Sequence, residues 1–160
     1  VAAQPFVEWL IHTFILHFKP REFAGRRIDP LLAREHRRHH RDPKNIANVF
    51  IPTKSLWVGV PIATVLTVLI IPSLGIALTM LLTMAVIGNV YEWTHFYVHS
   101  GCKPRHRYAR YIERAHRLHH YRNERYWMGV TNHLADHVLG TFPDKDDVPV
   151  SRTAKTLGVS

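Results

Sequence analysis

SLWVGVPIATVLTVLII (residues 55–71) and IALTMLLTMAVIGNVYEW (residues 76–93) are two apolar stretches separated only by PSLG (residues 72–75). The length of each stretch is close to the roughly 20 apolar residues that an α-helix needs to cross the hydrocarbon core of a bilayer. No Lys or Arg lies between Lys54 and Lys103. A pair of soluble helices would instead carry a polar face. The sequence therefore predicts a transmembrane helical hairpin.

The charge distribution supports a membrane rather than a nucleic acid as the anionic partner. Lys and Arg number 21 against 12 Asp and Glu, a formal net charge of +9 with neutral histidine. All of these basic residues lie in 19–54 and 103–155. A nucleic-acid-binding module would not leave so long a stretch between them without positive charge. The positive-inside rule predicts that both basic flanks lie on the cytoplasmic side.

The length and pattern of the chain predict one all-α, integral membrane domain over residues 1–160. Residues 1–18 are expected to end another membrane helix, 19–54 to be cytoplasmic, 55–99 to form the hairpin and 100–160 to form a cytoplasmic cap. The chain begins with Val rather than Met, so we expect that residues precede it. The single cysteine, Cys102, excludes an internal disulfide framework.

Thirteen histidines dominate the composition, and ten of them fall into four ordered boxes. On a helix, positions i, i+3 and i+4 share a face, so each HxxHH box is expected to direct three imidazoles toward one point. A spacing of five residues places two side chains about 140° apart on an ideal helix. The first box therefore fits only if its helix ends or distorts there, or if its rings serve different metals. The boxes are His12 and His17; His36, His39 and His40; His95 and His99; and His116, His119 and His120.

The two halves of the chain repeat the same order of features. EWLIHTFILHFKPR (8–21) and EHRRHH (35–40) parallel EWTHFYVHSGCKPR (92–105) and ERAHRLHH (113–120). Five histidines per half make ten, which is more than one metal ion can coordinate and suits two. Neutral imidazole is a good ligand for Fe, Zn, Cu and Ni. We therefore predict a dinuclear metal site in the histidine-rich cap.

Several other residues near the boxes leave two interpretations open. Glu8 and Glu92 precede the histidine pairs and either support a metal-binding ring from outside or only pack the helices. His106 is expected to be exposed. His133 and His137 could chelate a metal by spacing, although they stand outside the repeated pattern. The arginines within the HxxHH boxes are expected to point away from the metals, toward solvent or anionic lipid head groups; they are Arg37, Arg38 and Arg117.

The order of the four boxes around a membrane hairpin resembles the fatty acid hydroxylase/sterol desaturase superfamily of integral-membrane di-iron oxygenases. The chain is most similar to the fatty acid 2-hydroxylase branch, whose C-terminal signature reads here as HRLHHYRN (116–123) and GVTNHLADHVLGT (129–141). Ala135 departs from the family, which usually has an aromatic residue before the signature Asp.

The resemblance implies a site with two iron ions, which zinc can replace in purified protein, together with O₂. It implies that Asp136 and Thr141 support the metal cap without binding metal. No cytochrome b5-like domain is recognisable, so the electrons are expected from a separate protein of the cytochrome b5 or ferredoxin type. The ten implied ligands are His12, His17, His36, His39, His40, His95, His99, His116, His119 and His120.

The implied function is that of a non-haem di-iron monooxygenase of lipid metabolism, with its metal site on the cytoplasmic side. It would insert oxygen into a C–H bond of a lipid acyl chain in a fatty acid or ceramide-type substrate. A carotenoid ring hydroxylase and a sterol oxidase or desaturase are the alternatives within the superfamily, and a membrane metal-binding protein is the non-enzymatic one. The candidate substrate-lining residues are Trp57, Trp93, Phe96 and Tyr97, which could equally form an interfacial aromatic belt. Trp127 and Met128, which lead into the C-terminal signature, are candidates for the border of the substrate entrance.

Overall fold

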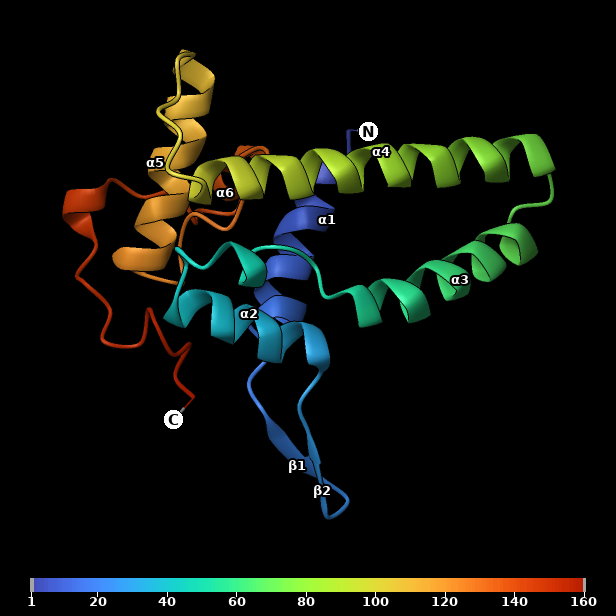
Figure 1. Ribbon diagram of the computed structural model, residues 1–160, viewed down its shortest axis with the longest axis horizontal. Helices are drawn as coiled ribbons and strands as arrows, with labels where there is room; N and C mark the ends of the chain where they lie inside the picture. The colour runs from blue at the N-terminus through green and yellow to red at the C-terminus, as the bar shows by residue number, and fades with distance from the viewer. Residues whose placement is uncertain (1, 160) are drawn as a thin grey trace.

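A computed structural model describes residues 2–159 and is mostly helical, as the sequence predicts. Two long helices extend from one end, and the shorter elements gather at the other (Figure 1). The elements in chain order are α1 (Gln4–Leu10), the π-helix η1 (Ile11–Leu16), β1 (Arg21–Phe23), β2 (Arg26–Ile28), α2 (Leu31–Arg41), η2 (Ile46–Asn48), α3 (Thr53–Ile70), α4 (Leu74–His99), α5 (Arg107–Tyr121), α6 (Leu134–Val138) and η3 (Lys145–Asp147).

The long helices α3 and α4 form the predicted hairpin. Both are long and apolar enough to cross a membrane, and only 6% of the apolar window of each is buried within the chain. Their few polar side chains bond to their own helix: the Thr79 hydroxyl donates to the Gly75 carbonyl (2.8 Å) and the Thr83 hydroxyl to the Thr79 carbonyl (2.7 Å). Such internal bonds satisfy hydroxyl groups where no water is available.

The helices α2 and α5 are amphipathic and carry the two HxxHH boxes. Each buries its three histidines and exposes most of its arginines. Arg38 and Arg117 point outward as predicted. The prediction was wrong for Arg37, which is buried, forms an ion pair with Asp29 and donates a hydrogen bond to the Phe18 carbonyl. Arg37 thus joins α2 to the chain that follows η1.

A two-stranded antiparallel hairpin, β1–β2, is the one departure from an all-helical fold within residues 2–159. Ala24 and Gly25 connect the strands and both have positive φ (50° and 71°). Two such residues are what a tight hairpin turn requires. The stretch lacks the alternating apolar pattern of a half-buried strand, so hydrophobic periodicity did not predict it.

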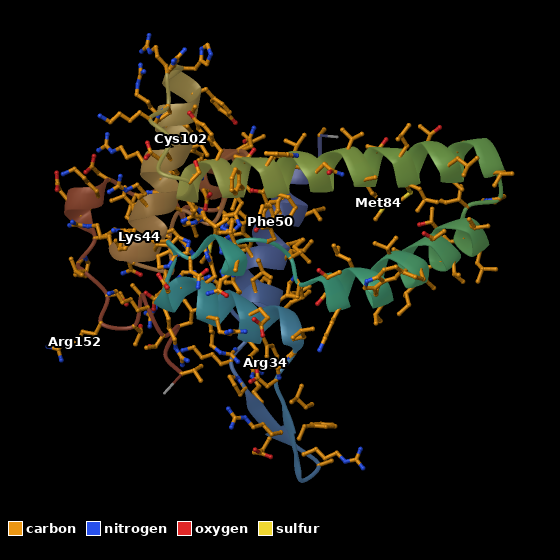
Figure 2. The ribbon with its side chains drawn as sticks, in the orientation of Figure 1. Arg34, Lys44, Phe50, Met84, Cys102 and Arg152 are labelled. Carbon is orange, nitrogen blue, oxygen red and sulfur yellow. The ribbon has the colours of Figure 1, made fainter. Side chains whose placement is uncertain are left out.

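The chain after α6 wraps back over the histidine-bearing end. Ser151 donates its N–H to the Arg122 carbonyl (2.7 Å), and Val148 packs with Ala115 and Trp127 in a small apolar core. Basic side chains surround this end of the molecule; Figure 2 labels Arg34, Lys44 and Arg152 there, whereas Met84 lies along the apolar helices. The fold therefore separates an apolar helical hairpin from a polar cap.

Candidate metal centre

The structure brings all ten box histidines together in two groups of five. Within each group, one ring nitrogen from every residue lies within 4.8 Å of the others. The first histidine group consists of His12, His17, His36, His40 and His119, and the second histidine group of His39, His95, His99, His116 and His120. Four segments contribute: η1 with the residue that follows it, α2, the end of α4, and α5.

The π-helix η1 explains how two histidines five residues apart join the same group. In a π-helix the N–H of one residue bonds to the carbonyl five residues earlier. The His17 N–H accordingly donates to the His12 carbonyl (3.1 Å), and the two ring centroids are 4.8 Å apart. The spacing left open a helix that ends, a helix that distorts, or two rings that serve different metals. The structure shows the distorted helix.

Each HxxHH box divides its histidines between the two groups, so the expectation that a box points at one place was wrong. In α2, His36 and His40 belong to the first group and His39 to the second. In α5 the assignment is reversed, with His119 alone in the first group. Positions i and i+4 lie nearly one above the other, whereas position i+3 is rotated to the other side of them. The boxes thereby bridge the two groups.

Backbone carbonyls fix the orientation of several rings. His40 Nδ1 lies 2.8 Å from the Ala154 carbonyl oxygen, and His119 Nδ1 lies 2.8 Å from that of Tyr126. A carbonyl only accepts, so each Nδ1 carries the proton and each neutral ring leaves Nε2 as a bare lone pair. These two Nε2 atoms are 3.2 Å apart. Two bare lone pairs at that distance repel unless a cation lies between them.

The buried rings are neutral at physiological pH. Burial lowers the pKa of His119 to about 4 and that of His12 to about 3. Burial, together with His119, lowers the pKa of His40 well below 6.5. Burial and the neighbouring His99 lower the pKa of His39 to about 2. Protonation therefore cannot supply the cation that these converging nitrogens require.

A metal ion in each histidine group fits this arrangement of donors. The Nε2 atoms of His17 and His95 are buried and have no hydrogen-bond partner among the described residues. In the second group, His99 Nε2 lies 3.1 Å from His39 Nε2 and 3.0 Å from His116 Nε2. Iron and zinc both accept imidazole nitrogen, and the metal keeps the rings deprotonated.

Glu8 holds the loop that orients His12. Its carboxylate accepts hydrogen bonds from the backbone N–H groups of Val130 and Thr131. The Met128 carbonyl, two residues earlier in the same loop, accepts from His12 Nδ1. Glu8 therefore acts on the ring through the backbone.

Glu92 has the same role in the other half of the chain. Its carboxylate accepts from the Ile51 N–H (3.1 Å), and the nearby Val49 carbonyl accepts from His95 Nδ1 (3.0 Å). Each glutamate thus clamps the segment that follows the HxxHH box of the opposite half. Among the described residues, neither carboxylate is hydrogen-bonded to a histidine ring.

Asp136 organises the loop that offers carbonyls to the first group. It accepts from the N–H groups of Met128 (2.9 Å) and Gly129 (2.7 Å), from Thr141 Oγ1 (2.6 Å) and from His133 Nδ1 (2.9 Å). Burial raises the pKa of Asp136, but these four hydrogen bonds outweigh burial and lower it below 3.8. Asp136 is therefore a carboxylate that supports the loop and belongs to neither group.

The remaining histidines lie outside both groups. His106 is exposed, as expected. His133 is fully buried against Asp136, and His137 is exposed with Nε2 2.9 Å from the Tyr111 hydroxyl. The spacing of His133 and His137 therefore does not produce a third histidine group within residues 2–159.

An apolar groove of about 840 Å³ lies between α1 and α4. It follows one side of α4 from Gly75 to Tyr91, and Glu8 lies at its wall. The Tyr91 ring is 5.7 Å from the ring of His95, so the groove ends beside the second histidine group. The six residues named as substrate-lining candidates do not line it: Trp57 and Trp93 are exposed, Phe96 and Tyr97 are half-buried, and Trp127 and Met128 are buried in the core.

Residues 1–141 match the protein family described as fatty acid hydroxylase. The chain belongs to the fatty acid hydroxylase family. A dihydroceramide fatty acyl 2-hydroxylase, FAH2, of Arabidopsis thaliana is 30% identical over 139 residues, which cover 86% of this chain and 56% of that protein. The fatty acid 2-hydroxylase of Rattus norvegicus is 29% identical over 143 residues, covering 88% and 38%. No solved structure matches significantly.

The chain spans about half the length, or less, of the curated relatives that it matches. Two features of its centre were missed from the sequence. The Ala154 carbonyl, which orients His40, lies beyond the family match, and the Tyr126 carbonyl orients His119. Backbone acceptors leave no side-chain pattern, so the sequence did not indicate that this terminal segment, in which Ala154 is buried, packs against the centre.

Proposed function

We propose that this chain forms the catalytic part of an O₂-dependent hydroxylase that inserts oxygen into a C–H bond of a lipid acyl chain. The observation that carries the proposal is the pair of adjoining five-histidine groups, in which neutral rings converge through bare Nε2 atoms. The names of the relatives favour a fatty acid or ceramide-type substrate.

The ten group histidines are the proposed ligands of two iron ions. Bound iron would supply the activation of O₂ and the oxidising power that amino-acid side chains lack. The chain itself holds and orients the rings through backbone carbonyls and excludes water, since most of these histidines are fully buried. Asp136, Thr141, Glu8 and Glu92 keep those carbonyls in place and are positioning residues.

The groove between α1 and α4 is the proposed path of the acyl chain. Its wall is apolar along α4, which is long enough to lie within a membrane. A lipid chain in this groove would need no polar partner and would reach the second histidine group beside Tyr91. The other wall contains Val7 and Ile11 of α1 and η1. A hydrophobic groove of this kind selects chain length through its volume and shape.

The proposed orientation places the histidine-bearing cap on the cytoplasmic side. Both flanks of the α3–α4 hairpin are rich in Lys and Arg, whereas the turn between the helices has none. Hydroxylation with O₂ reduces the second oxygen atom to water and consumes electrons and protons. The electrons would come from a separate electron-transfer protein that reaches the cap from the cytoplasm.

Product analysis tests the proposal directly. Membranes that contain the chain, supplied with O₂ and an electron-transfer system, should accumulate acyl chains that carry one added hydroxyl, detected by mass spectrometry. The His39→Ala variant should form none, whereas His106→Ala, at an exposed histidine outside both groups, should keep full activity. Product from His39→Ala at the wild-type rate would refute the proposed site.

A further inference from the structure

The β1–β2 hairpin projects from the cap, and at its base the Arg21 guanidinium lies over the Phe18 ring, 5.5 Å from the ring centroid. All six strand residues are exposed. An isolated two-stranded hairpin is only marginally stable in water. Its exposed residues nevertheless include two large apolar side chains: Phe23 is 71% exposed and Ile28 42%. This combination indicates a surface that is covered by something outside the chain.

The strand register sorts the hairpin into two different faces. Arg21 pairs with Ile28 and Phe23 with Arg26. Residues directly opposite one another in an antiparallel pair point to the same side, and alternate residues share a face. The apolar-cationic face therefore consists of Arg21, Phe23, Arg26 and Ile28, and the opposite face of Glu22 and Arg27.

The opposite face turns toward the cap. Glu22 and Arg27 line a polar pocket together with Lys19, Gly158 and Val159 at the C-terminal end of the described chain. Arg21, at the base of the hairpin, also lines this pocket, whereas Phe23, Arg26 and Ile28 do not. In Figure 1 that end lies on the side of the hairpin away from the tip of α3–α4. The apolar-cationic face consequently looks toward the side on which α3 and α4 extend.

The hairpin also lies at the level where the apolar helices begin. In Figure 1 the strands run across the direction in which α3 and α4 extend. Measured along that direction, their turn reaches about the same position as the first turn of α3, although it lies well below it in the view. That turn contains Lys54, the last basic residue before the apolar stretch. The boundary between the membrane core and its headgroup layer is expected at this level.

We propose that the apolar-cationic face rests on the headgroup layer of the membrane that α3 and α4 enter, and that it binds anionic phospholipid. Phe23 and Ile28 would lie at the boundary of the acyl region, and Arg26 would contact lipid phosphates. Elements that lie in this layer combine apolar side chains with Lys or Arg in the same way. The inference is independent of the proposed reaction, since it concerns only the contact between the hairpin and lipid.

Thiol accessibility in nanodiscs tests this contact. In a Cys102→Ser background, Ile28→Cys places a thiol on the apolar-cationic face, and the matched variant Glu22→Cys places one on the opposite face. Both retain Phe23 and all the arginines. In nanodiscs that contain phosphatidylserine, the Ile28→Cys thiol should react with a charged maleimide about tenfold more slowly than the Glu22→Cys thiol, because lipid headgroups shield it.

Three further comparisons decide the result. Adding Phe23→Ser and Arg26→Gln, or replacing phosphatidylserine with phosphatidylcholine, should reduce the difference between the two thiols. Equal rates at both positions in anionic nanodiscs would overturn the proposal. So would shielding that depends on the number of chains per nanodisc and not on lipid charge, because the face would then cover a second copy. Unchanged metal content in both cysteine variants establishes that the centre stays intact, whatever its activity.

Discussion

Single imidazole rings have two separate tasks in this chain, one for each nitrogen. In His40 and His119, Nδ1 is committed to a backbone carbonyl, which leaves Nε2 free for a metal. Burial keeps these rings neutral, as a ligand must be. A histidine outside the groups, such as His133, donates a hydrogen bond from Nδ1 to a carboxylate, and its Nε2 has no hydrogen-bond partner among the described residues.

Substitutions in the two groups should remove different metal ions. His17 belongs only to the first group and His99 only to the second. We expect His17→Ala and His99→Ala each to lower the metal content from about two ions per chain to about one, with membrane insertion intact. Elemental analysis of the purified variants measures this. Retention of full metal in both would show that the groups are assigned wrongly.

The gathering of the ten box histidines could be predicted at the residue scale, because their spacing can be read directly from the sequence. Their orientation could not, because the acceptors that orient them are carbonyls of Tyr126, Met128, Val49 and Ala154. Any residue type supplies a carbonyl. The division of each HxxHH box between two groups also escaped prediction, because the helix alone does not show where the partner helices approach.

At the scale of elements, local distortions bring the ligands together. The π-turn in η1 aligns His12 with His17, and the loop after α5 bends at Trp127, which has a positive φ of 55°. A buried, well-packed residue in that region is held there by its surroundings. The bend places the Tyr126 and Met128 carbonyls against two rings of the first group.

Gly129 should be essential for this loop. A Cβ there would lie 2.3 Å from the Asn132 carbonyl oxygen and 2.9 Å from His133 Nδ1, so even alanine forces the loop to move. We expect Gly129→Ala to lower both the melting temperature and the metal content. Gly59→Ala is the matched control, since nothing lies within 4 Å of its Cβ. Equal behaviour of the two variants would mean that the loop does not orient the centre.

The groove along α4 should determine which acyl chains react. Gly88 lines the groove, whereas Leu82 is on an exposed part of the same helix outside it. Gly88→Phe should fill part of the volume and shift products toward shorter chains, with metal content unchanged. Leu82→Phe should leave the product distribution as it is. Product profiles from mixed-length acyl chains decide between these outcomes, and identical profiles for both variants would exclude the groove as the substrate path.

Element boundaries were predictable where hydrophobicity alone sets them. The predicted stretches 55–71 and 76–93 became α3 and α4, with α4 continuing to His99. The β1–β2 hairpin was not predicted, because its stability does not come from a buried face in this chain. Four of the proposed substrate-lining residues were chosen as aromatic side chains near the membrane, and Trp127 and Met128 because they lead into the C-terminal signature. Neither criterion indicates whether a side chain faces a groove, lipid or the core.

In the whole molecule, each half of the chain provides one histidine and one loop-holding glutamate to the other half. Each half contributes a histidine pair and the i and i+4 members of one box to its own group, and the i+3 member to the other. Glu8 and Glu92 each hold the loop that follows the opposite box. Loss of either half would therefore leave both groups incomplete.

The stability of the metal-free protein should fall on acidification. The pKa values of the group histidines outside α4 are lowered below 6.5, so between the folded and unfolded pKa the unfolded chain binds more protons. Each additional proton changes the free energy of unfolding by about 1.4 kcal/mol per pH unit. Melting temperatures should be steady above pH 6.5 and fall below it. A flat profile from pH 7.5 to 5.5 would show that these rings are not buried and neutral in the folded protein.

The central claim is that the two histidine groups hold two metal ions. Elemental analysis of the purified chain, with His106→Ala as the control for histidines outside the groups, tests it most directly. We predict about two ions of iron, or of zinc acquired during expression, per chain in both proteins. A well-folded chain that binds no metal, or only one ion, would contradict the dinuclear centre and the proposed hydroxylase function.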